Sequence, residues 1–384
     1  MNICFVTGSR ADYGLLSKLM SYFKEDKKFN LQIIVTGSHL SKKQGFTYRE
    51  ILKDKFKINQ KINLKLDKKN SNNIINPMSI ALRDFDKAFK KLKPELLIVL
   101  GDRYEIFCAV SAAHVNNLKI CHLHGGELTR GSLDDAFRHS ITKMSHYHFV
   151  SHLKYALRLK QLGENPKKIF IVGGFGVDLI KKTPLLKKKQ LENKLGIKFG
   201  KKNIMVTYNP ENISTKKNKK NFNEVLKALK LLKDTKVIFT KSNVDKDGKM
   251  INSMIIKYVK KNKKNSYLFS SMGYINYLSA LQISDLSIGN SSSGLLEAPS
   301  FKKPSINIGN RQMDRLKASS VVHSPPKHQL ILKNINKVLG VKFQNDLKKT
   351  KNPYGTGGAS LKTYNLIKKI DNTDSYNKKF FDYL

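Results

Sequence analysis

The sequence has 384 residues, of which 40% are hydrophobic and 26% charged, and its formal net charge is +43 at pH 7. A chain of this length is too long for one ordinary core and suits two α/β domains. No run of about 18 apolar residues occurs, and no charged segment precedes the apolar amino-terminal residues, which argues against a membrane span and against export. We therefore expect a cytoplasmic globular protein with no membrane partner.

Lysine residues supply most of the positive charge, in runs such as 187–189 and 216–220. Few aromatic residues lie between them for base stacking, so the pattern predicts a solvated surface and no nucleic-acid partner. Nucleic-acid binding remains the non-enzyme alternative, supported by the charge alone. Cys4, Cys108 and Cys121 lie in or beside apolar segments without close spacing, which favours buried reduced thiols over a disulfide framework or a zinc site.

Apolar strand-like runs alternate with helix-length amphipathic segments, a pattern typical of βαβ units and parallel sheets. A first series of strands is expected at residues 2–7, 31–36, 95–100, 119–123, 147–151 and 169–172, and a second at 203–207, 236–240, 267–269, 285–289 and 305–308. A helix is expected between Pro77 and Pro94, with a core-facing side formed by Met78, Ala81, Leu82, Phe85, Ala88, Phe89 and Leu92.

The two series predict an α/β protein with two Rossmann-like domains and parallel sheets. Glycines at 173, 174 and 176, followed by a lysine-rich stretch, indicate a connection between the domains. We therefore place the first domain at residues 1–176 and the second at 177–359. The remaining residues, 360–384, are expected to form a carboxyl-terminal helix that packs back on the first domain.

The first predicted strand is followed directly by Gly8-Ser9-Arg10 and then by a helical segment. Backbone N–H groups at that helix start, together with Arg10, are suited to bind a phosphate. The full G-x-G-x-x-G fingerprint is absent, which disfavours a dinucleotide cofactor and favours a nucleotide or nucleotide-sugar ligand. An ordinary turn with a surface arginine is the alternative interpretation.

In the second half, a strand ends in a Gly-Asn-Ser-Ser-Ser-Gly segment before a short helix. Bare backbone and small hydroxyl groups can wrap closely around a diphosphate, so the predicted binding residues are Ser291, Ser292, Ser293 and Gly294. Glu297, just inside the helix, is suited to accept ribose hydroxyl groups. Helix capping by serine is the alternative. Arg311 and Arg315 follow the next strand and either contact phosphates or lie on the surface.

Residues 122–152 contain six of the ten histidines, and they follow a strand that ends in Gly101-Asp102-Arg103. His122 and His124 are predicted to share one strand face, a spacing that also permits a metal ion. No pattern of further ligands accompanies them, so no metal is predicted, and proton transfer or binding of a polar substrate is favoured. Ser132 and Asp135 have capping-box spacing, which leaves Asp134 as the carboxylate expected to react.

The motifs, taken in order, are GSRADYG, GDRYE, HGGE, DDAFRHSITKMS, GNSSSGLLEA and NPYGTGG. Together they resemble the UDP-N-acetylglucosamine 2-epimerase family, in its hydrolysing, sialic-acid-pathway branch, over essentially the whole chain. The resemblance implies a GT-B architecture with a nucleotide sugar bound in the cleft between two Rossmann-like domains, no cofactor, and a homodimer or tetramer. It also implies elimination of the nucleoside diphosphate to a glycal, followed by addition of water with inversion at C2.

The resemblance also assigns roles to residues. Asp102 and Asp134 match catalytic carboxylates and Arg138 a supporting active-site arginine, whereas the matched nucleotide-binding positions are Arg10, Ser291, Glu297 and Arg315. His124 stands where several relatives carry a glutamate, which leaves Glu127 as the nearest carboxylate to take that role, and both are expected among the catalytic residues. Asn209, expected among the substrate- and nucleotide-binding residues, replaces a histidine that is common in relatives, and Thr356 replaces a more usual aspartate.

Several alternatives remain open at this level. The substrate is either UDP-N-acetylglucosamine, giving N-acetylmannosamine for sialic acid synthesis, or a UDP- or GDP-linked 2,4-diacetamido-trideoxy sugar, giving a precursor of legionaminic acid. A GT-B glycosyltransferase would use the same donor but would not need the carboxylates of Asp102, Glu127 and Asp134 around C2. A non-hydrolysing epimerase is disfavoured by the HGGE and RHSITKMS segments, and the expected enzyme is of the glycosyl-hydrolase type.

Overall fold

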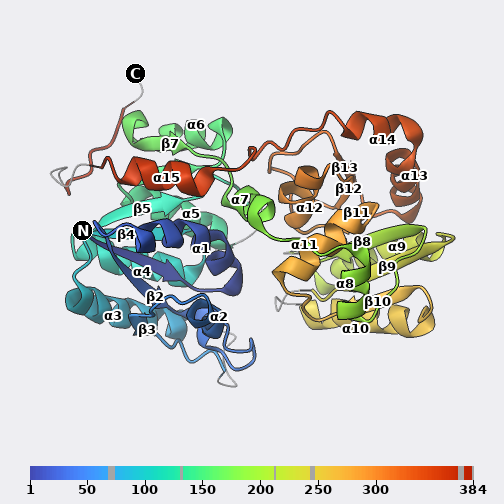
Figure 1. Cartoon of the computed structure of the whole chain (residues 1–384), viewed down its shortest axis with the longest axis horizontal. Coiled ribbons are helices and arrows are strands. Elements are labelled where there is room, and N and C mark those ends of the chain that lie inside the picture. The colour runs from blue at the N-terminus through green and yellow to red at the C-terminus, as the bar shows by residue number, and fades with distance from the viewer. Residues whose placement is uncertain (68–73, 130–132, 212, 243–246, 371–375, 383–384) are drawn as a thin grey trace. The chain divides into compact units, whose positions relative to one another are not determined.

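The computed structural model describes residues 1–67, 74–129, 133–211, 213–242, 247–370 and 376–382, and it divides into two compact units (Figure 1). The first unit consists of Met1–Glu127, Leu133–Leu179 and Gly357–Leu384, and the second consists mainly of Ile180–Thr356. The chain thus enters the second unit after Leu179 and returns after Thr356. The domain limits expected from the sequence are 176 and 359.

The first unit is built on a seven-stranded sheet in the order β3-β2-β1-β4-β5-β6-β7, with every pair parallel. Its strands are β1 Asn2–Thr7, β2 Asn30–Val35, β3 Gln60–Lys61, β4 Leu96–Leu100, β5 Lys119–Leu123, β6 Tyr147–Val150 and β7 Ile169–Ile171. The central strand β4 reads LLIVL and is buried along its whole length, as expected for a parallel strand covered on both faces.

Helices cover both faces of this sheet. They are α1 Arg10–Glu25, α2 Tyr48–Lys53, α3 Ile75–Leu92, α4 Tyr104–Val115, α5 Leu133–Met144, α6 Leu153–Gln161, α7 Phe175–Lys182 and α15 Ala359–Ile367, with 3-10 turns η1 Gly37–Leu40 and η2 Pro166–Lys168. Along β1, Ile3 and Phe5 pack with α1 and α15, whereas Cys4 and Val6 pack with α3 and α4. This alternation gives three layers with a core on each side of the sheet.

The second unit has a six-stranded parallel sheet in the order β10-β9-β8-β11-β12-β13. Its strands are β8 Lys202–Thr207, β9 Thr235–Thr240, β10 Ser266–Phe269, β11 Leu286–Gly289, β12 Ser305–Ile308 and β13 Val321–Ser324. Its helices are α8 Lys188–Leu195, α9 Thr215–Lys230, α10 Gly248–Lys261, α11 Tyr274–Ile283, α12 Ser293–Leu296, α13 His328–Leu339 and α14 Val341–Leu347, with the 3-10 turn η3 Ala298–Phe301. Two apolar clusters again lie on opposite faces of the sheet.

The fold class predicted from the sequence is confirmed, and each predicted strand is present with shifts of at most one residue at its ends. Two strands were missed. Gln60–Lys61 is a polar two-residue edge strand, and Val321–Ser324 is a short edge strand, so neither carries a long apolar run. The helix predicted between Pro77 and Pro94 is α3, but the prediction that Leu82 faces the core was wrong, because its side chain is 39% exposed.

Each sheet order reverses direction once, between β1 and β4 in the first unit and between β8 and β11 in the second. Ligands of open α/β sheets bind outside the carboxyl ends of the strands at such switch points. In the first unit, Gly8 follows β1 and Asp102 lies just beyond β4. In the second, Asn209 lies just beyond β8 and Asn290 follows β11. The topology therefore marks one candidate binding edge in each unit.

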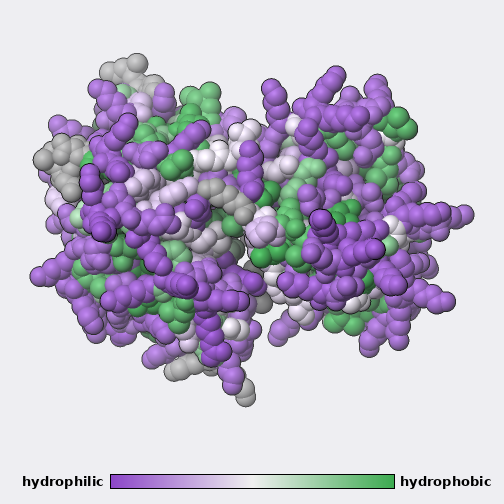
Figure 2. Space-filling view, viewed as in Figure 1, coloured by the Kyte–Doolittle hydropathy of each residue, from purple (hydrophilic) through white to green (hydrophobic). Residues whose placement is uncertain are grey.

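Hydrophilic residues cover most of the visible face of each unit (Figure 2).

The three cysteines are free and buried, as predicted. Within the described ranges, no helix is both long and apolar enough to span a bilayer.

Candidate functional site

The guanidinium of Arg138 joins two carboxylates at the switch point of the first unit. Arg138 belongs to α5. Its Nη2 donates a hydrogen bond to Oδ2 of Asp102, and its Nη1 lies 3.5 Å from Oε2 of Glu127. Burial by itself lowers the pKa of Arg138, but the two carboxylates outweigh this effect and the pKa is raised. A guanidinium that is only 4% exposed requires such pairing, because an unpaired buried charge is costly. Three of the predicted site residues are therefore brought together.

The two carboxylates differ in their surroundings. Oε1 of Glu127 accepts hydrogen bonds from Nδ1 of His124 at 2.9 Å and from Oγ of Ser151 at 3.3 Å, and the side chain is 5% exposed. The Asp102 side chain is 19% exposed. Glu127 is thus held as a fixed buried anion, whereas Asp102 is the member of the pair that solvent or a ligand reaches more readily.

The prediction that His122 and His124 share one strand face was wrong. Strand β5 ends at Leu123, and His124 has a left-handed backbone with φ of 63°. Its Nε2 accepts the N–H of Phe175 at 3.5 Å while Nδ1 donates to Glu127. Because the two imidazoles have separate partners, they do not form the two-histidine arrangement that a metal ion would use. Over the described part of the chain, no three His, Cys, Asp or Glu side chains are grouped as metal ligands.

His122 is completely buried beneath the site. Its Nε2 lies 2.8 Å from the carbonyl oxygen of Gly101, which can only accept, so Nε2 carries the proton. Nδ1 then accepts from Oγ1 of Thr142, 3.1 Å away. Burial is the main reason that the pKa of His122 falls to about 3, so the ring is neutral at physiological pH. His122 therefore joins α5 to the end of β4 through these two hydrogen bonds.

The Gly125-Gly126 turn allows the chain to pass close to α6. Gly126 has φ of 77°, and a Cβ atom there would lie 2.5 Å from Leu159 and 2.6 Å from the carbonyl oxygen of Tyr155. Arg158 donates to the carbonyl oxygen of Gly126. This fixed turn delivers Glu127 to the Arg138 guanidinium.

Asp134 lies in the first turn of α5, one turn before Arg138, and is half-buried. The helix begins at Leu133, three residues before Ala136, where the sequence predicted its start. The predicted capping box involves Ser132, which lies outside the described residues. The assignment of Asp134 as a reacting carboxylate stays a prediction.

Charged side chains surround the first βα turn, and one of them, Glu105 of α4, was not singled out by sequence reasoning. Ser9 caps α1 by accepting the N–H of Asp12, while Arg10 forms an exposed ion pair with Glu50 at 3.0 Å. Glu105 is fully buried, pairs with Arg103, and occupies the space that a side chain at Gly8 would need. The GDRYE motif contained this signal, because a glutamate in an apolar helical segment must be paired when it is buried. The phosphate role of Arg10 stays a prediction.

In the second unit, Asn290 ties together the ends of β8 and β11. Its side chain accepts the N–H of Asn209 and donates to the carbonyl oxygen of Asn209, both at 2.7 Å. Gln312 donates to the carbonyl oxygen of Asn290 at 3.1 Å. Asn290 is fully buried, and sequence reasoning missed it although it lies within the serine-rich motif. Because these bonds use the backbone of Asn209, they place no demand on which side chain stands there.

Hydrogen bonds from polar side chains hold the serine-rich turn at residues 291–294. Tyr277 donates to Oγ of Ser293 at 2.7 Å, and Ser293 donates to Glu297. Burial raises the pKa of Glu297. The prediction that Glu297 lies inside the short helix was wrong: α12 ends at Leu296, and Glu297 stands at the junction with the following 3-10 turn.

The remaining predicted binding residues lie around the same edge. Ser291 accepts the N–H of Ser293 at 3.3 Å, and Ser292 precedes α12 without a capping bond from its side chain. Gly294 is buried within α12, and Arg315 is half-buried in the turn after β12. Their contacts with a nucleotide stay predictions.

Comparisons with known proteins identify the family. A family model described as UDP-N-acetylglucosamine 2-epimerase matches residues 21–368. The chain is 44% identical to the GDP/UDP-N,N'-diacetylbacillosamine 2-epimerase (hydrolyzing) of Campylobacter jejuni, over 84% of each protein. It is 36% identical to the polysialic acid biosynthesis protein P7 of Escherichia coli, over 99% of this chain and 96% of that protein.

Solved structures share the architecture. The UDP-GlcNAc 2-epimerase of Neisseria meningitidis, solved bound to UDP-GlcNAc, matches with a TM-score of 0.83 at 18% identity, covering 96% of this chain and 100% of that chain. At this identity the likeness shows the fold alone, and it agrees with the GT-B-like class predicted from the motifs. The family predicted from those motifs is confirmed by the sequence matches. The chain belongs to the UDP-N-acetylglucosamine 2-epimerase family.

Proposed function

We propose that this protein is a hydrolysing nucleotide-sugar 2-epimerase, which converts a nucleotide-linked 2-acetamido sugar and water into the free manno-configured sugar and a nucleoside diphosphate. The observation that carries the proposal is the buried Arg138 guanidinium bridging Asp102 and Glu127. Chemistry at C2 of a sugar needs positioned carboxylates, whereas transfer of the sugar to an acceptor does not. The 44% identical relative is named as a hydrolysing epimerase, which supports the same reaction.

The reaction has two steps. In the first, a base removes the proton at C2, the electron pair of that C–H bond forms the C1–C2 double bond of the glycal, and the electron pair of the C1–O bond leaves with the diphosphate. In the second, a water molecule gives one proton to a base while its oxygen adds to C1 of the glycal, and an acid delivers a proton to C2 on the face opposite to the one from which the first proton was removed. A weakly acidic C–H group requires a base held within hydrogen-bond reach, and a second group must serve the addition.

We assign these roles to Asp102 and Asp134. Asp102 is the more exposed carboxylate of the bridged pair, and Arg138 holds it at the carboxyl end of β4. Asp134 belongs to the helix that carries Arg138, one turn away. Glu127 is the buried anion that fixes the other side of the guanidinium. His124 acts as its hydrogen-bond donor and thus as a positioning residue.

The leaving diphosphate is assigned to the second unit. The half-buried residues Ser291 and Ser292 follow strand β11, and Asn290 joins the end of this strand to the end of β8. Preformed backbone donors stabilise a departing diphosphate because they need no reorganisation during the reaction. Arg10, Glu297 and Arg315 complete the predicted nucleotide contacts.

We favour a UDP- or GDP-linked 2,4-diacetamido-trideoxy sugar as the substrate. The support is the 44% identical relative, whose name gives diacetylbacillosamine as its sugar. UDP-N-acetylglucosamine is the second candidate, because the 36% identical relative is named for polysialic acid biosynthesis. The two sugars differ at C4 and C6, so a pocket that hydrogen-bonds one C4 group discriminates against the other.

The test is to incubate the purified protein separately with each of the three donors in deuterated water and to follow the products by proton NMR. Free manno-configured sugar with deuterium at C2, together with nucleoside diphosphate, is the expected result for the true donor. An epimerised sugar that keeps its diphosphate would instead indicate the non-hydrolysing reaction. Absence of turnover with all three donors would contradict the proposal and favour glycosyl transfer.

A further inference from the structure

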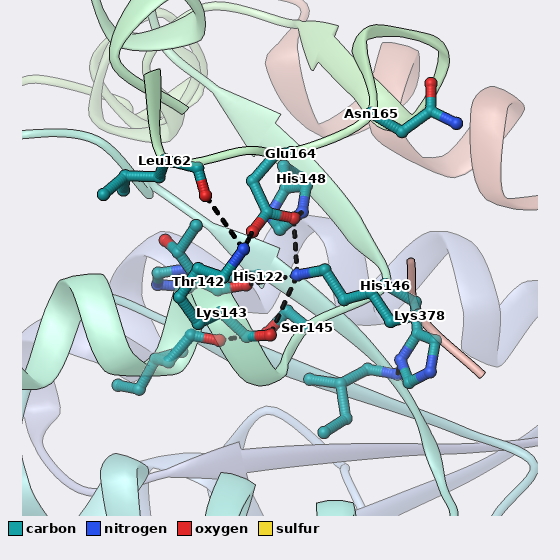
Figure 3. Close-up of polar contacts among 12 residues, drawn as sticks. His122, Thr142, Lys143, Ser145, His146, His148, Leu162, Glu164, Asn165 and Lys378 are labelled. Atoms are coloured by element: carbon teal, nitrogen blue, oxygen red, sulfur yellow. Dashed lines mark hydrogen bonds and ion pairs between the residues drawn. The ribbon is translucent and has the colours of Figure 1, made fainter. Parts of the chain in front are cut away.

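A second buried cluster lies at the opposite end of α5 from Asp134, and it is centred on the carboxylate of Glu164 (Figure 3). Glu164 is 1% exposed and follows α6. Nε2 of His148, on β6, lies 2.8 Å from its Oε2, and Nζ of Lys143, on α5, lies 3.0 Å from its Oε1. The third partner of Glu164 is Lys378, whose Nζ contacts Oε2.

Lys378 comes from the carboxyl-terminal segment 376–382 and reaches the last turn of α5. Its Nζ donates to the carbonyl oxygens of Thr142 at 3.0 Å and Lys143 at 2.9 Å. The last carbonyl groups of a helix have no partner within the helix, and this end of the helix dipole attracts cations. The single ammonium group of Lys378 therefore has two roles. It caps the carboxyl-terminal end of α5, and it is a counter-ion for Glu164.

Neighbouring residues of the same segment hold Lys378 in place. The carbonyl oxygen of Tyr376 lies 3.1 Å from Nε2 of His146, and the N–H of Phe381 donates to the carbonyl oxygen of Gly163 at 3.0 Å. The ring of Phe380 lies against Gly163, and Nζ of Lys143 is 4.6 Å from the centre of that ring. The segment is thus anchored on both sides of Lys378.

The capped turn of α5 is connected to the proposed catalytic residues by two short routes. Thr142, whose carbonyl oxygen binds Lys378, also bonds through its side chain to His122 and so to the backbone before Asp102. One turn earlier in the same helix, Arg138 bridges Asp102 and Glu127. A shift of the last turn of α5 would therefore move both supports of Asp102.

We propose that Lys378 is a positioning residue of the active site: its ammonium group fixes the carboxyl-terminal turn of α5 and thereby the placement of Arg138 against Asp102. The part of this inference that concerns catalysis rests on the proposed function. The effect depends on the ammonium group of Lys378, because Glu164 and two helix carbonyl oxygens lose a shared donor when that group is removed. A small displacement of catalytic groups is sufficient to lower turnover by about 10-fold or more.

The test compares Lys378→Met, Lys378→Arg and the matched control Lys379→Met, which alters an exposed lysine in the same segment. Hydrogen exchange of the amides of residues 138–144 is measured first, because it does not depend on a substrate. Steady-state kcat and KM are then measured with the donor that the parent protein hydrolyses. Circular dichroism at the assay temperature establishes that each variant is folded.

Lys378→Met is expected to accelerate exchange in residues 138–144 and to lower kcat by about 10-fold or more, while KM changes less than about threefold. Lys378→Arg is expected to recover part of kcat, and Lys379→Met is expected to behave like the parent. Faster exchange with unchanged kcat would overturn the proposal, since Lys378 would then only stabilise the fold. Unchanged exchange would also overturn it.

Failure of the proposed function gives a different result, namely a parent protein that turns over none of the nucleotide sugars. In that case the exchange measurement alone decides the structural inference. Faster exchange in Lys378→Met, but not in Lys379→Met, supports the cap on α5, and equal rates in both variants contradict it.

Discussion

Nε2 of His122 donates to the carbonyl oxygen of Gly101 at 2.8 Å, immediately before Asp102 in the chain. Replacement by leucine is expected to destabilise the protein by about 1–3 kcal/mol, because Gly101 and Thr142 lose a buried hydrogen-bond partner. Urea unfolding measures this loss. His114→Leu changes an exposed histidine and serves as the control. Equal unfolding midpoints for the two variants would show that the His122 bonds contribute no net stability.

Asp102→Asn and Asp134→Asn are expected to lower kcat by about 10²–10⁴-fold, which is the range for removal of a general acid or base. The dissociation constant of the nucleoside diphosphate, measured by calorimetry, is expected to change little, because neither side chain is assigned to the nucleotide. Asp346→Asn, at an exposed position, is the control. Near-normal turnover in both active-site variants would refute the carboxylate assignment.

Gly126→Ala is expected to destabilise the first unit more than Gly45→Ala does. Both glycines have similar backbone angles, with φ of 77° and 80°, so the left-handed strain of roughly 1–2 kcal/mol applies to both. A Cβ atom at Gly126 would also meet Leu159 at 2.5 Å, whereas nothing lies within 4 Å of one at Gly45. The difference between the thermal unfolding midpoints of the two variants measures the effect of the close contact with α6. Equal midpoints would mean that the turn adjusts to the added methyl group without loss of stability.

Asn290→Ala is expected to weaken binding of the nucleoside diphosphate and to destabilise the second unit by about 1–3 kcal/mol, since the backbone groups of Asn209 lose their buried partners. Calorimetric titration with UDP and GDP measures the affinity. Asn345→Ala removes an exposed asparagine and is the matched control. An unchanged dissociation constant in Asn290→Ala would show that the hydrogen bonds of Asn290 do not contribute to nucleotide binding.

Stability is expected to fall in acid because of Glu164. Burial by itself raises the pKa of this carboxyl group, but the bonds from His148 and Lys378 outweigh burial and lower the pKa to about 2. A lowered pKa contributes stability above the pKa of the unfolded chain, near 4.5, that is lost as pH falls toward 2. The contribution is about 3 kcal/mol at neutral pH.

Urea unfolding between pH 6 and about pH 2.5 measures this contribution. Glu164→Gln is expected to be less stable than the parent near neutral pH and to show a shallower acid dependence. Glu25→Gln, at an exposed position, is the control. Parallel acid profiles for the parent and Glu164→Gln would contradict the assignment.

Local pattern was sufficient for the strands that carry apolar runs and for the family, but not for the two short edge strands β3 and β13. Leu96–Leu100 is an uninterrupted apolar run, and a parallel strand buried on both faces requires such a run, so its position could be read directly. The HGGE and serine-rich motifs identified the family because their residues are adjacent in sequence. The same reasoning placed His124 on a strand face, and it failed because a backbone reversal just after β5 leaves no periodic signal.

The sequence by itself determined the α/β class, the order of the strands along the chain, the family and the segments that carry the chemistry, because each depends on residues close together in the chain. Only the tertiary structure decided that Arg138 joins Asp102, 36 residues away, and that Lys378 caps α5 at Thr142, 236 residues away. Such pairs depend on the path of the backbone and on the requirement that buried charges find partners. Neither leaves a pattern in neighbouring residues.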